Sequence, residues 1–371
     1  MALFDLSHQA ERLGPSLIER ISEVLKHGRF ILGPEVEELE AALASYVGVR
    51  HAVGVSSGRD ALSMALMAAG VGAGDAVFVP AFTFSATAGA VVAAGAVPVF
   101  TDVDSKTFNM DPEQLERAIK NMLRHGSLKP KAVIPVDLYG VPADYPAIET
   151  IAAKYGLTVI ADAAQSFGGM LGGRRVGALG KIAATSFYPT KPLGAFGDGG
   201  AVFTDDDELA DAVRQIRNHG TRGSGDVALR LGMTGRLDTL QAAVLLVSLE
   251  SFEERLARRC RIAERYQRAL EGVVGTPPQL RNAVPAWALY TIRVPDRESV
   301  RARLAEAGIQ TGIYYRVPLH RHPAFADRLT GEENLPVSEQ LAREVLSLPL
   351  HAGLSDEDVD YIIGGVLQAV C

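Results

Sequence analysis

Residues 186–200 read Ser-Phe-Tyr-Pro-Thr-Lys-Pro-Leu-Gly-Ala-Phe-Gly-Asp-Gly-Gly, a run almost free of charge in which the single lysine is Lys191. A strand-like segment leads into this run, and its four glycines allow the backbone to turn tightly and to approach a bound group closely. A lysine held among small and apolar groups loses hydration, which lowers its pKa toward neutrality and makes the amine available for Schiff-base chemistry. The ordinary alternative is a lysine in a surface loop.

Short apolar runs alternate with helical segments on both sides of this stretch. Such alternation is typical of a mostly parallel sheet with helices on both faces. In sheets of this kind ligands lie at the carboxyl ends of the strands, so we expect the chemistry just after each run. The seven expected strands are Ala52–Val55, Ala76–Val79, Val97–Phe100, Ala132–Val136, Thr158–Ala161, Ile182–Phe187 and Ala201–Phe203.

Two of these strand ends are followed by residues that could bind a ligand. One could bind a phosphate group and the other could stack on an aromatic ring. Residues 56–61, Ser-Ser-Gly-Arg-Asp-Ala, open a helix whose free amides and dipole favour an anion, although the same residues also make an ordinary helix cap. Phe84 follows the second run and offers an aromatic face near the end of the sheet, with a core phenylalanine as the alternative.

Asp162 follows the fifth run and lies at the carboxyl end of a strand that should be central and buried. A buried carboxylate needs a cationic or hydrogen-bonding partner, and either a helix cap or a heteroaromatic N–H would serve. An anion-binding helix start, a ring to stack on, an aspartate for a pyridine nitrogen and a lysine for an aldehyde together suit pyridoxal phosphate. The four signals therefore favour this cofactor.

The C-terminal third predicts a smaller α+β unit. A long helical stretch over residues 236–271 should connect the two parts, and the glycines and prolines of residues 272–278 mark the break. Beyond them we expect a strand at Tyr290–Val294, a helix capped by Asp296, a strand near Gln310–Tyr314 and a last helix whose Ser355-Asp-Glu-Asp358 resembles a capping box. We place the large domain at residues 1–250 and the small domain at residues 251–371.

Composition narrows the class of protein. The 371 residues are 47% hydrophobic and 22% charged, with a net charge of −7, which gives no reason to expect nucleic acid or an anionic membrane as partner. Cys260 and Cys371 are too few for a disulfide framework, so we expect a reducing, cytoplasmic compartment, and the N-terminus carries no secretory signal. The charge-free run at residues 76–101 contains two prolines and reads as strand, helix and strand. No cluster has the spacing of metal ligands.

The chain resembles the DegT/StrS family of sugar-nucleotide aminotransferases, which are pyridoxal-phosphate enzymes of fold type I. The resemblance runs from Leu17 to near the C-terminus. It is carried by Gly28-Arg-Phe-Ile-Leu-Gly-Pro34, Ser57-Gly-Arg-Asp-Ala-Leu62, Asp162-Ala-Ala-Gln165, Thr185-Ser-Phe-Tyr-Pro-Thr-Lys191, Gly197-Asp-Gly-Gly200, Arg236-Leu-Asp-Thr-Leu-Gln-Ala-Ala243, Tyr314-Tyr-Arg-Val-Pro-Leu-His320 and Leu348-Pro-Leu-His351.

This resemblance implies roles for particular residues. Lys191 and Asp162 would be catalytic, with Lys191 bonded to the cofactor aldehyde and Asp162 paired with the pyridine nitrogen. Gln165 would reach the ring hydroxyl and Phe84 would stack on the ring. The remaining cofactor-binding residues would be Ser57, Gly58, Arg59, Ser186 and Thr234. The substrate-binding residues would be Phe30, Arg236, Tyr315, Arg316 and His320.

Three positions depart from the family pattern. Arg59 stands where threonine is usual, although its backbone amide can still bind phosphate. Thr234 replaces an asparagine that reaches the partner subunit's cofactor phosphate in the family. Arg316 replaces a proline and would either meet an anionic substrate or lie on the surface.

The implied reaction moves the amino group of L-glutamate to a keto sugar linked to a nucleoside diphosphate, in a homodimer with shared active sites. The motifs look most like the branch that aminates sugar C3, in particular UDP-2-acetamido-2-deoxy-3-oxo-glucuronate, for surface polysaccharides such as the O-antigen of lipopolysaccharide. One alternative is a C4 or 6-deoxy-hexose aminotransferase acting on a dTDP- or GDP-linked sugar. Another is a non-catalytic, cofactor-binding regulator.

Overall fold

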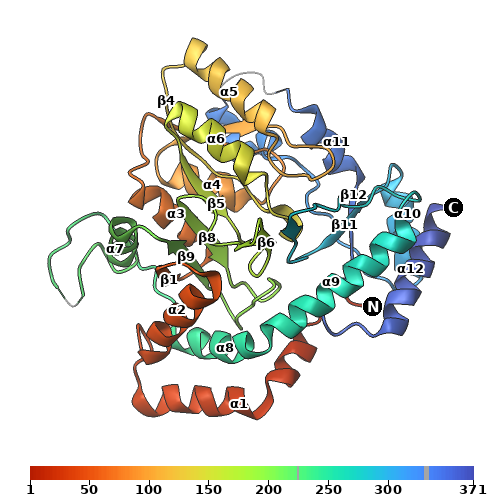
Figure 1. Cartoon of the computed structure of the whole chain (residues 1–371), viewed down its shortest axis with the longest axis horizontal. Coiled ribbons are helices and arrows are strands. Elements are labelled where there is room, and N and C mark those ends of the chain that lie inside the picture. Colours follow the sequence, from red (N-terminus) through yellow and green to blue (C-terminus); the bar gives the residue numbers. More distant parts are fainter. Residues whose placement is uncertain (224, 330–333) are drawn as a thin grey trace.

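The computed structural model describes residues 1–223, 225–329 and 334–371, and a seven-stranded sheet lies at the centre of its larger part (Figure 1). All seven expected strands are present. They are β1 (His51–Val55), β2 (Asp75–Pro80), β3 (Val97–Thr101), β4 (Lys129–Val133), β5 (Thr158–Asp162), β8 (Ile182–Ser186) and β9 (Gly200–Thr204). Strand β4 ends three residues earlier than expected; beyond it, Val136 forms an isolated parallel bridge with Asp162.

The strand order is β1-β9-β8-β5-β4-β2-β3. Strand β9 runs antiparallel to both of its neighbours, whereas the other neighbouring strands pair in parallel. Because Gly200 at the start of β9 pairs with both Val55 and Ser186, the carboxyl ends of β1 and β8 meet at one edge of the sheet. The carboxyl end of β5 lies at the same edge, since Asp162 pairs with Ala184. This edge is where a parallel sheet places its ligands.

Helices cover both faces of the sheet, as predicted. One buried apolar cluster joins the sheet to α2 (Pro34–Val47), α5 (Pro112–His125), α6 (Tyr145–Tyr155) and α8 (Thr239–Glu250). A second cluster joins the opposite face to α3 (Gly58–Ala68), α4 (Ser85–Ala93) and α7 (Asp207–Ile216). The expected strand, helix and strand of residues 76–101 are β2, α4 and β3. In the described chain no helix is both long and apolar enough to cross a membrane.

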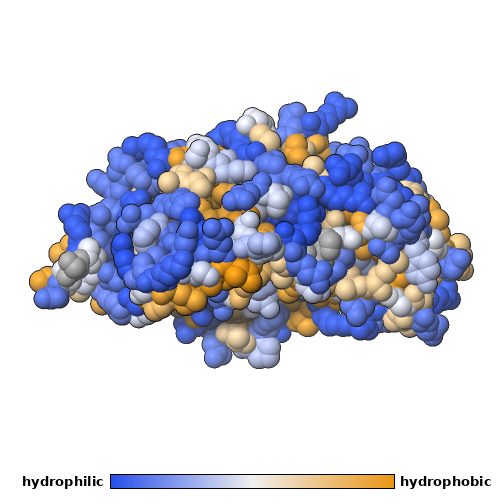
Figure 2. All heavy atoms as spheres, turned by 90° about the horizontal axis from the view of Figure 1, so that it is seen from below, coloured by the Kyte–Doolittle hydropathy of each residue, from blue (hydrophilic) through white to orange (hydrophobic). Residues whose placement is uncertain are grey.

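The N-terminal helix α1 (Leu6–His27) is kinked at Gly14, which takes a positive φ of 49°. It packs on α8 through Leu13, Leu17, Val244 and Val247. Figure 2 views the molecule from the side on which α1 lies in Figure 1 and shows apolar patches among larger hydrophilic areas. The exposed Ile18 and Leu25 of α1 contribute to the apolar surface.

A separate apolar core forms in the C-terminal part, as expected for a small α+β unit. Its elements are α9 (Phe252–Leu270), β11 (Tyr290–Arg293), α10 (Arg297–Glu306), β12 (Val345–Leu348) and α12 (Asp356–Val370), whereas α11 (Pro336–Glu344) packs in a neighbouring cluster with Phe82 and Tyr139. The capping box before α12 is confirmed, because Ser355 and Asp358 exchange side-chain and backbone hydrogen bonds. Outside both cores, β6 (Met170–Leu171), β7 (Arg174–Arg175) and β10 (Ala283–Val284) form a small sheet.

Two details of the C-terminal prediction are wrong. The expected strand near Gln310–Tyr314 is a single bridge between Gly312 and Ser347, and the residues that pair with β11 form β12. The long helix expected over residues 236–271 is two helices, α8 and α9, because the backbone of Ser251 leaves the helical conformation between them.

Helix α9 passes from one core to the other. Phe252 packs in the core of the large sheet, whereas residues 262–270 pack in the C-terminal core. The N-terminal residues Met1 and Phe4 also pack against C-terminal elements, although residues 1–250 were assigned to the large domain. Because α9 and the N-terminal residues connect the two cores, the predicted domain boundary at residue 250 stays a prediction.

Candidate active site

A cavity of about 1050 Å³ lies over the edge of the sheet where β1, β5 and β8 end. Segments far apart in the sequence contribute to its wall, including the starts of α3 and α4 and the loop that follows β8. The predicted site residues that line it are Ser57, Gly58, Arg59, Phe84, Asp162, Gln165, Ser186, Lys191, Thr234, Arg236 and Tyr315. The cavity thus brings together both predicted catalytic residues and every predicted cofactor-binding residue.

The start of α3 forms the anion-binding end of the cavity. Ser57 caps the helix, and its hydroxyl accepts a hydrogen bond from the amide of Asp60 at 3.1 Å. Gly58 lies so close to the end of β8 that a Cβ at this position would be 2.6 Å from Ser186 Cβ. The first amides of a helix have no partner within the helix, so they can donate to a phosphate.

Asp162 ends β5 with its carboxylate buried under the cavity. Oδ2 accepts a hydrogen bond from the Thr87 hydroxyl at 2.8 Å, and Oδ1 accepts one from the amide of Ala164 at 3.2 Å. Burial raises the pKa of this carboxyl, while these two bonds and the charge of Lys191 oppose the shift. A protonated ring nitrogen in the cavity would give the buried carboxylate the cationic partner that it needs.

Lys191 is half-buried in the turn that follows β8. Its backbone amide donates to Tyr188 O at 2.8 Å, which holds the turn closed. Burial lowers the pKa of the Lys191 ammonium, and the charge of Asp162 partly opposes this effect. This shift has the direction that the sequence predicted, and it favours the free amine that covalent catalysis requires.

Aromatic and amide groups form the next part of the wall. Phe84 is 54% exposed just before α4, and its ring centre lies 6.0 Å from that of Tyr315. Gln165 Oε1 accepts a hydrogen bond from the amide of Tyr139 at 2.8 Å, and its Nε2 lies 3.4 Å from the Tyr315 hydroxyl. These contacts hold Gln165 and Tyr315 at the cavity wall, and Phe84 leaves a ring face open to it.

Thr234 and Arg236 reach the cavity from the loop after α7. Isolated bridges pair Thr234 with Asn218 and Arg236 with Val55, so the backbone of this segment lies beside the end of β1. Arg236 Nη1 donates to Asn218 Oδ1 at 3.0 Å, which orients the guanidinium group. Arg236 is half-buried and available to an anionic ligand.

Three predicted substrate-binding residues lie outside the lining of this cavity. Phe30 is exposed in the loop before α2, and Arg316 is exposed and pairs with Glu298 at 3.3 Å. His320 is buried with its ring 3.2 Å from Glu339. Phe30 and Arg316 belong to loops and His320 to the short 3-10 helix Leu319–Arg321, where a motif gives the position along the chain and not the direction of the side chain.

Thr87 and Phe4 are among the cavity residues that sequence reasoning missed. Thr87 bonds to Asp162, and its position three residues after Phe84 on the same helix face was a usable signal. Phe4 lines the cavity from the N-terminal segment, packed with Tyr314 and Tyr315. Nothing in the sequence around Phe4 points to this role.

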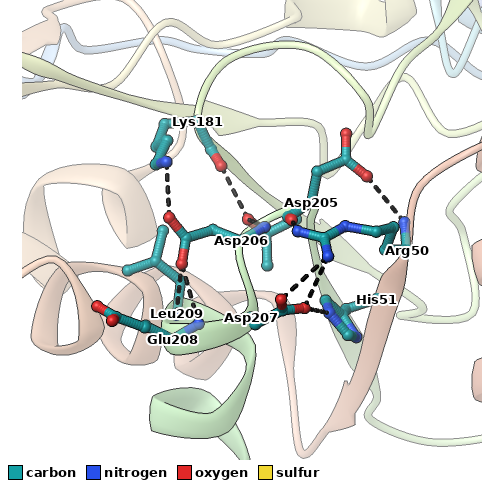
Figure 3. Close-up of polar contacts among 9 residues, drawn as sticks. Arg50, His51, Lys181, Asp205, Asp206, Asp207, Glu208 and Leu209 are labelled. Atoms are coloured by element: carbon teal, nitrogen blue, oxygen red, sulfur yellow. Dashed lines mark hydrogen bonds and ion pairs between the residues drawn. The ribbon is translucent and has the colours of Figure 1, made fainter.

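A cluster of charged side chains lies at the start of α7, beside β1 and β9 (Figure 3). Lys181 pairs with Asp206 at 2.6 Å, while Arg50 and His51 pair with Asp207 at 3.0 Å and 2.6 Å. These hydrogen bonds and charges lower the pKa of both carboxyl groups. Because its charges are mutually paired, we assign this cluster to holding the start of α7 against β1 and β9. Among the described residues no group of His, Cys, Asp and Glu could hold a metal ion.

The fold and the cavity define a pyridoxal-phosphate enzyme of fold type I. The residues fit this cofactor, since the close approach of Gly58 to Ser186 leaves a cradle for a phosphate and Asp162 and Lys191 share the same cavity. Relatives of known structure carry the cofactor in its aldehyde or amino form.

The comparison with known proteins extends this assignment. The family model "DegT/DnrJ/EryC1/StrS aminotransferase family" matches residues 12–367, and the chain belongs to this family of aminotransferases. It is 47% identical to the UDP-2-acetamido-2-deoxy-3-oxo-D-glucuronate aminotransferase of Pseudomonas aeruginosa, over 96% of this chain and 97% of that one. It is 42% identical to the dTDP-3-amino-3,4,6-trideoxy-alpha-D-glucose transaminase of Streptomyces venezuelae, over 98% and 94%.

A solved structure of a family member from Brucella abortus has the same fold. It superposes with a TM-score of 0.96 at 48% sequence identity, covering 99% of this chain and 98% of that one. The protein is accordingly a pyridoxal-phosphate-dependent sugar aminotransferase, as the resemblance implied.

Proposed function

We propose that this enzyme transfers the amino group of L-glutamate to a keto group at C3 of a nucleotide-linked sugar. The first candidate for the acceptor is UDP-2-acetamido-2-deoxy-3-oxo-glucuronate, the substrate named for the relative from Pseudomonas aeruginosa. The second relative is also named for an amino group at C3. The observation that carries the chemistry is the half-buried Lys191 amine in one cavity with the buried Asp162 carboxylate.

Different residues of the cavity would have different roles in such a transfer. When bound, pyridoxal phosphate supplies an electron sink that receives the amino group from the donor and passes it to the acceptor. Lys191 Nζ would take the proton from the amino-bearing carbon of the donor and return a proton to the corresponding carbon of the sugar. Asp162 would keep the ring nitrogen protonated, while Ser57, Gly58 and Ser186 would hold the phosphate.

Arg236 is our candidate for the group that recognises the acceptor. Its guanidinium lines the cavity and is oriented by Asn218, so it can bind a carboxylate in a bidentate manner. A uronate differs from a neutral 6-deoxy-hexose by such a carboxylate. Arg316, the other arginine considered for this role, pairs with Glu298 away from the cavity.

We also propose that the active enzyme is a homodimer whose two sites share residues. The loop that ends in Thr234 and Arg236 exposes three aliphatic side chains, those of Val227, Leu229 and Leu231, and Leu231 is 87% exposed. Exposed apolar side chains next to a functional cavity are typical of an interface. A two-fold dimer would cover them and bring the same loop to the partner's site.

Subunit mixing tests the shared site. Lys191→Ala and Arg236→Ala proteins, each inactive or weak alone when the sugar is well below the wild-type KM, are mixed under conditions that allow exchange and assayed at that sugar concentration. A mixed dimer then has one intact site if Arg236 serves the partner, so random pairing restores roughly a quarter of wild-type activity. Verified exchange without recovered activity would show that Arg236 does not complete the partner's site.

Substrate choice is tested with a panel of 3-keto and 4-keto nucleotide sugars carrying UDP, dTDP or GDP. The cofactor-loaded enzyme is supplied with L-glutamate, and formation of 2-oxoglutarate is followed. We expect the highest kcat/KM with the 3-keto uronate. A faster reaction with a 4-keto or 6-deoxy sugar would favour the alternative acceptor. Cofactor binding without turnover on any sugar would point to a non-catalytic regulator.

A further inference from the structure

A second, much smaller cavity adjoins the active site. Its volume is about 40 Å³, and it lies where the N-terminal segment, α1, the start of α9 and the loop after β12 come together. Thr190 and Lys191 line both this cavity and the large one, and so does Phe4. The turn that carries the catalytic lysine is therefore part of the wall between the two.

Three guanidinium groups line the small cavity, those of Arg12, Arg255 and Arg259. We call them the arginine cluster. Among the described residues that line the cavity, Asp5 carries the one carboxylate, and its Oδ1 accepts a hydrogen bond from the Ser7 hydroxyl at 3.0 Å. Arg12 pairs with Glu254 at 3.1 Å, whereas no carboxylate of the described chain forms an ion pair with Arg255 or Arg259.

The two inner arginines are buried and bind only neutral oxygens in the described chain. Arg255 Nη2 donates to Ser248 O and Oγ, both at 2.7 Å, and its buried Nε has no hydrogen-bond partner. Arg259 Nη1 donates to Trp287 O at 2.9 Å and to Leu350 O at 3.1 Å. Each of the two arginines is 9% exposed. A buried charge without a counter-charge is costly, so the arrangement favours binding of an anion.

The pKa shifts of Arg255 and Arg259 also favour binding of an anion. The pKa of both inner guanidinium groups is lowered to about 10, first by burial and then by the charge of Arg12 on Arg255 and of Arg255 on Arg259. An anion in the cavity would relieve this repulsion. A buried water molecule needs a cavity volume of about 10–15 Å³. A cavity of about 40 Å³ therefore accepts a carboxylate group but not a whole amino acid.

We propose that the arginine cluster binds the side-chain carboxylate of the amino donor, and this inference rests on the function proposed above. The donor's amino group must lie in the large cavity beside Lys191, and its α-carboxylate is attached to the same carbon. The side-chain carboxylate is two methylene groups further away and can extend past Thr190 and Lys191 into the small cavity. The enzyme then selects a dicarboxylic donor such as L-glutamate over L-alanine.

The test compares two donors in Arg259→Gln and Arg255→Gln. Loss of one charge-assisted contact should lower kcat/KM for L-glutamate by about 10- to 100-fold in the half-reaction without sugar. The value for L-alanine, which has no side-chain carboxylate, should stay within about twofold, since it makes no use of this contact. Equal losses for both donors, or no loss for either, would overturn the proposal.

Arg258→Gln is the matched control on the same helix. Arg258 bonds to Asp356 at 2.8 Å and to Leu354 O at 2.7 Å and does not line the small cavity. The Arg258→Gln variant should leave the preference for L-glutamate over L-alanine unchanged. Arg12→Gln provides a variant that should fold in any case, because Arg12 is a surface residue paired with the exposed Glu254. It should weaken use of L-glutamate less than the two inner variants do.

A binding measurement separates this inference from the proposed function. Glutarate carries two carboxylates but no amino group, so it can bind without reacting. Calorimetric titration of the cofactor-loaded wild-type protein should give a dissociation constant about tenfold or more below that of Arg259→Gln. Wild-type protein that binds glutarate but aminates no sugar would refute the proposed acceptor and keep the anion site. Turnover with L-glutamate but equal glutarate binding by both proteins would refute the anion site alone.

Discussion

The sheet edge and the C-terminal loops contribute to the same cavity. The sequence predicted which side chains of the sheet edge line this cavity much better than it did for the loops. Asp162, which ends β5, lines the cavity as expected, and so does Lys191 in the turn that follows β8. Residues in the C-terminal loops behave differently, since Tyr315 lines the cavity whereas Arg316 and His320 do not. A strand in a parallel sheet fixes where its carboxyl end lies, and a loop leaves the direction of each side chain open.

Lys191→Ala gives the largest expected effect at the sheet edge. Without the amine that moves the proton, both half-reactions should slow by about 1000-fold or more, while the fold is retained. Single-turnover absorbance changes with L-glutamate and with the amino sugar measure the two rates. In the wild-type protein, borohydride reduction followed by peptide mass mapping should find the cofactor on Lys191. A variant with near wild-type rates would remove Lys191 from the mechanism.

Asp162→Asn should come next. The neutral amide cannot supply the charge-assisted bond to the ring nitrogen, so we expect each half-reaction to slow by about 10- to 100-fold. Both halves should be affected, because both need the protonated ring. Unchanged single-turnover rates, measured in a variant with wild-type cofactor content, would contradict the assigned role.

Arg236→Ala should act on one half of the reaction. Loss of a bidentate contact to the acceptor should raise the KM for the sugar by about tenfold and leave the glutamate half-reaction intact. Asn218→Ala, which removes only the partner of Arg236, should have a smaller effect in the same direction. If both halves fall equally, Arg236 has a structural role instead.

Asp137 shows that a carboxylate near a strand end need not serve catalysis. It is fully buried and accepts hydrogen bonds from the Ser166 hydroxyl at 2.7 Å and the amide of Ala143 at 2.9 Å. Burial raises the pKa of Asp137 to about 7, against the ordinary value that the unfolded chain should show. The folded state therefore holds more protons between these values, and stability falls as the pH rises toward 7.

Asp137→Asn should remove this loss of stability. The melting temperature of the wild-type protein should decrease from pH 5 to pH 8 by more than that of the variant, as measured by thermal unfolding over this range. The activity of the variant with both substrates should stay near that of the wild type. A parallel pH dependence of the two proteins would show that Asp137 is not the group responsible.

Arg316→Ala should have the smallest effect. Its ion pair with Glu298 is exposed, and such pairs contribute about 0–1 kcal/mol to stability. We expect KM and kcat within about twofold of wild type on every sugar of the panel. A large rise in the KM for the sugar would mean that the loop moves Arg316 into the site when the substrate binds.

The fold was predictable because the pattern of apolar runs is long and regular. The seven strands could be placed from the alternation alone, since most of their residues are apolar and buried. The break at Ser251 and the pairing of β11 with β12 could not, because they depend on contacts between distant segments. In the site, Asp162 ends a strand and Lys191 lies in the turn after one, whereas Phe4 reaches the cavity only through tertiary packing.

The passage of α9 through two cores has a mechanical consequence. Phe252 in its first turn packs in the large core and its last turns pack in the C-terminal core, so α9 would transmit a movement of one core to the other, with the non-helical Ser251 as the point of bending. A rotation about Ser251 would carry Arg255 and Arg259 toward or away from the turn that holds Lys191. Binding of a donor carboxylate would then draw the two cores together, and backbone amide exchange near Ser251 should slow when glutarate is added.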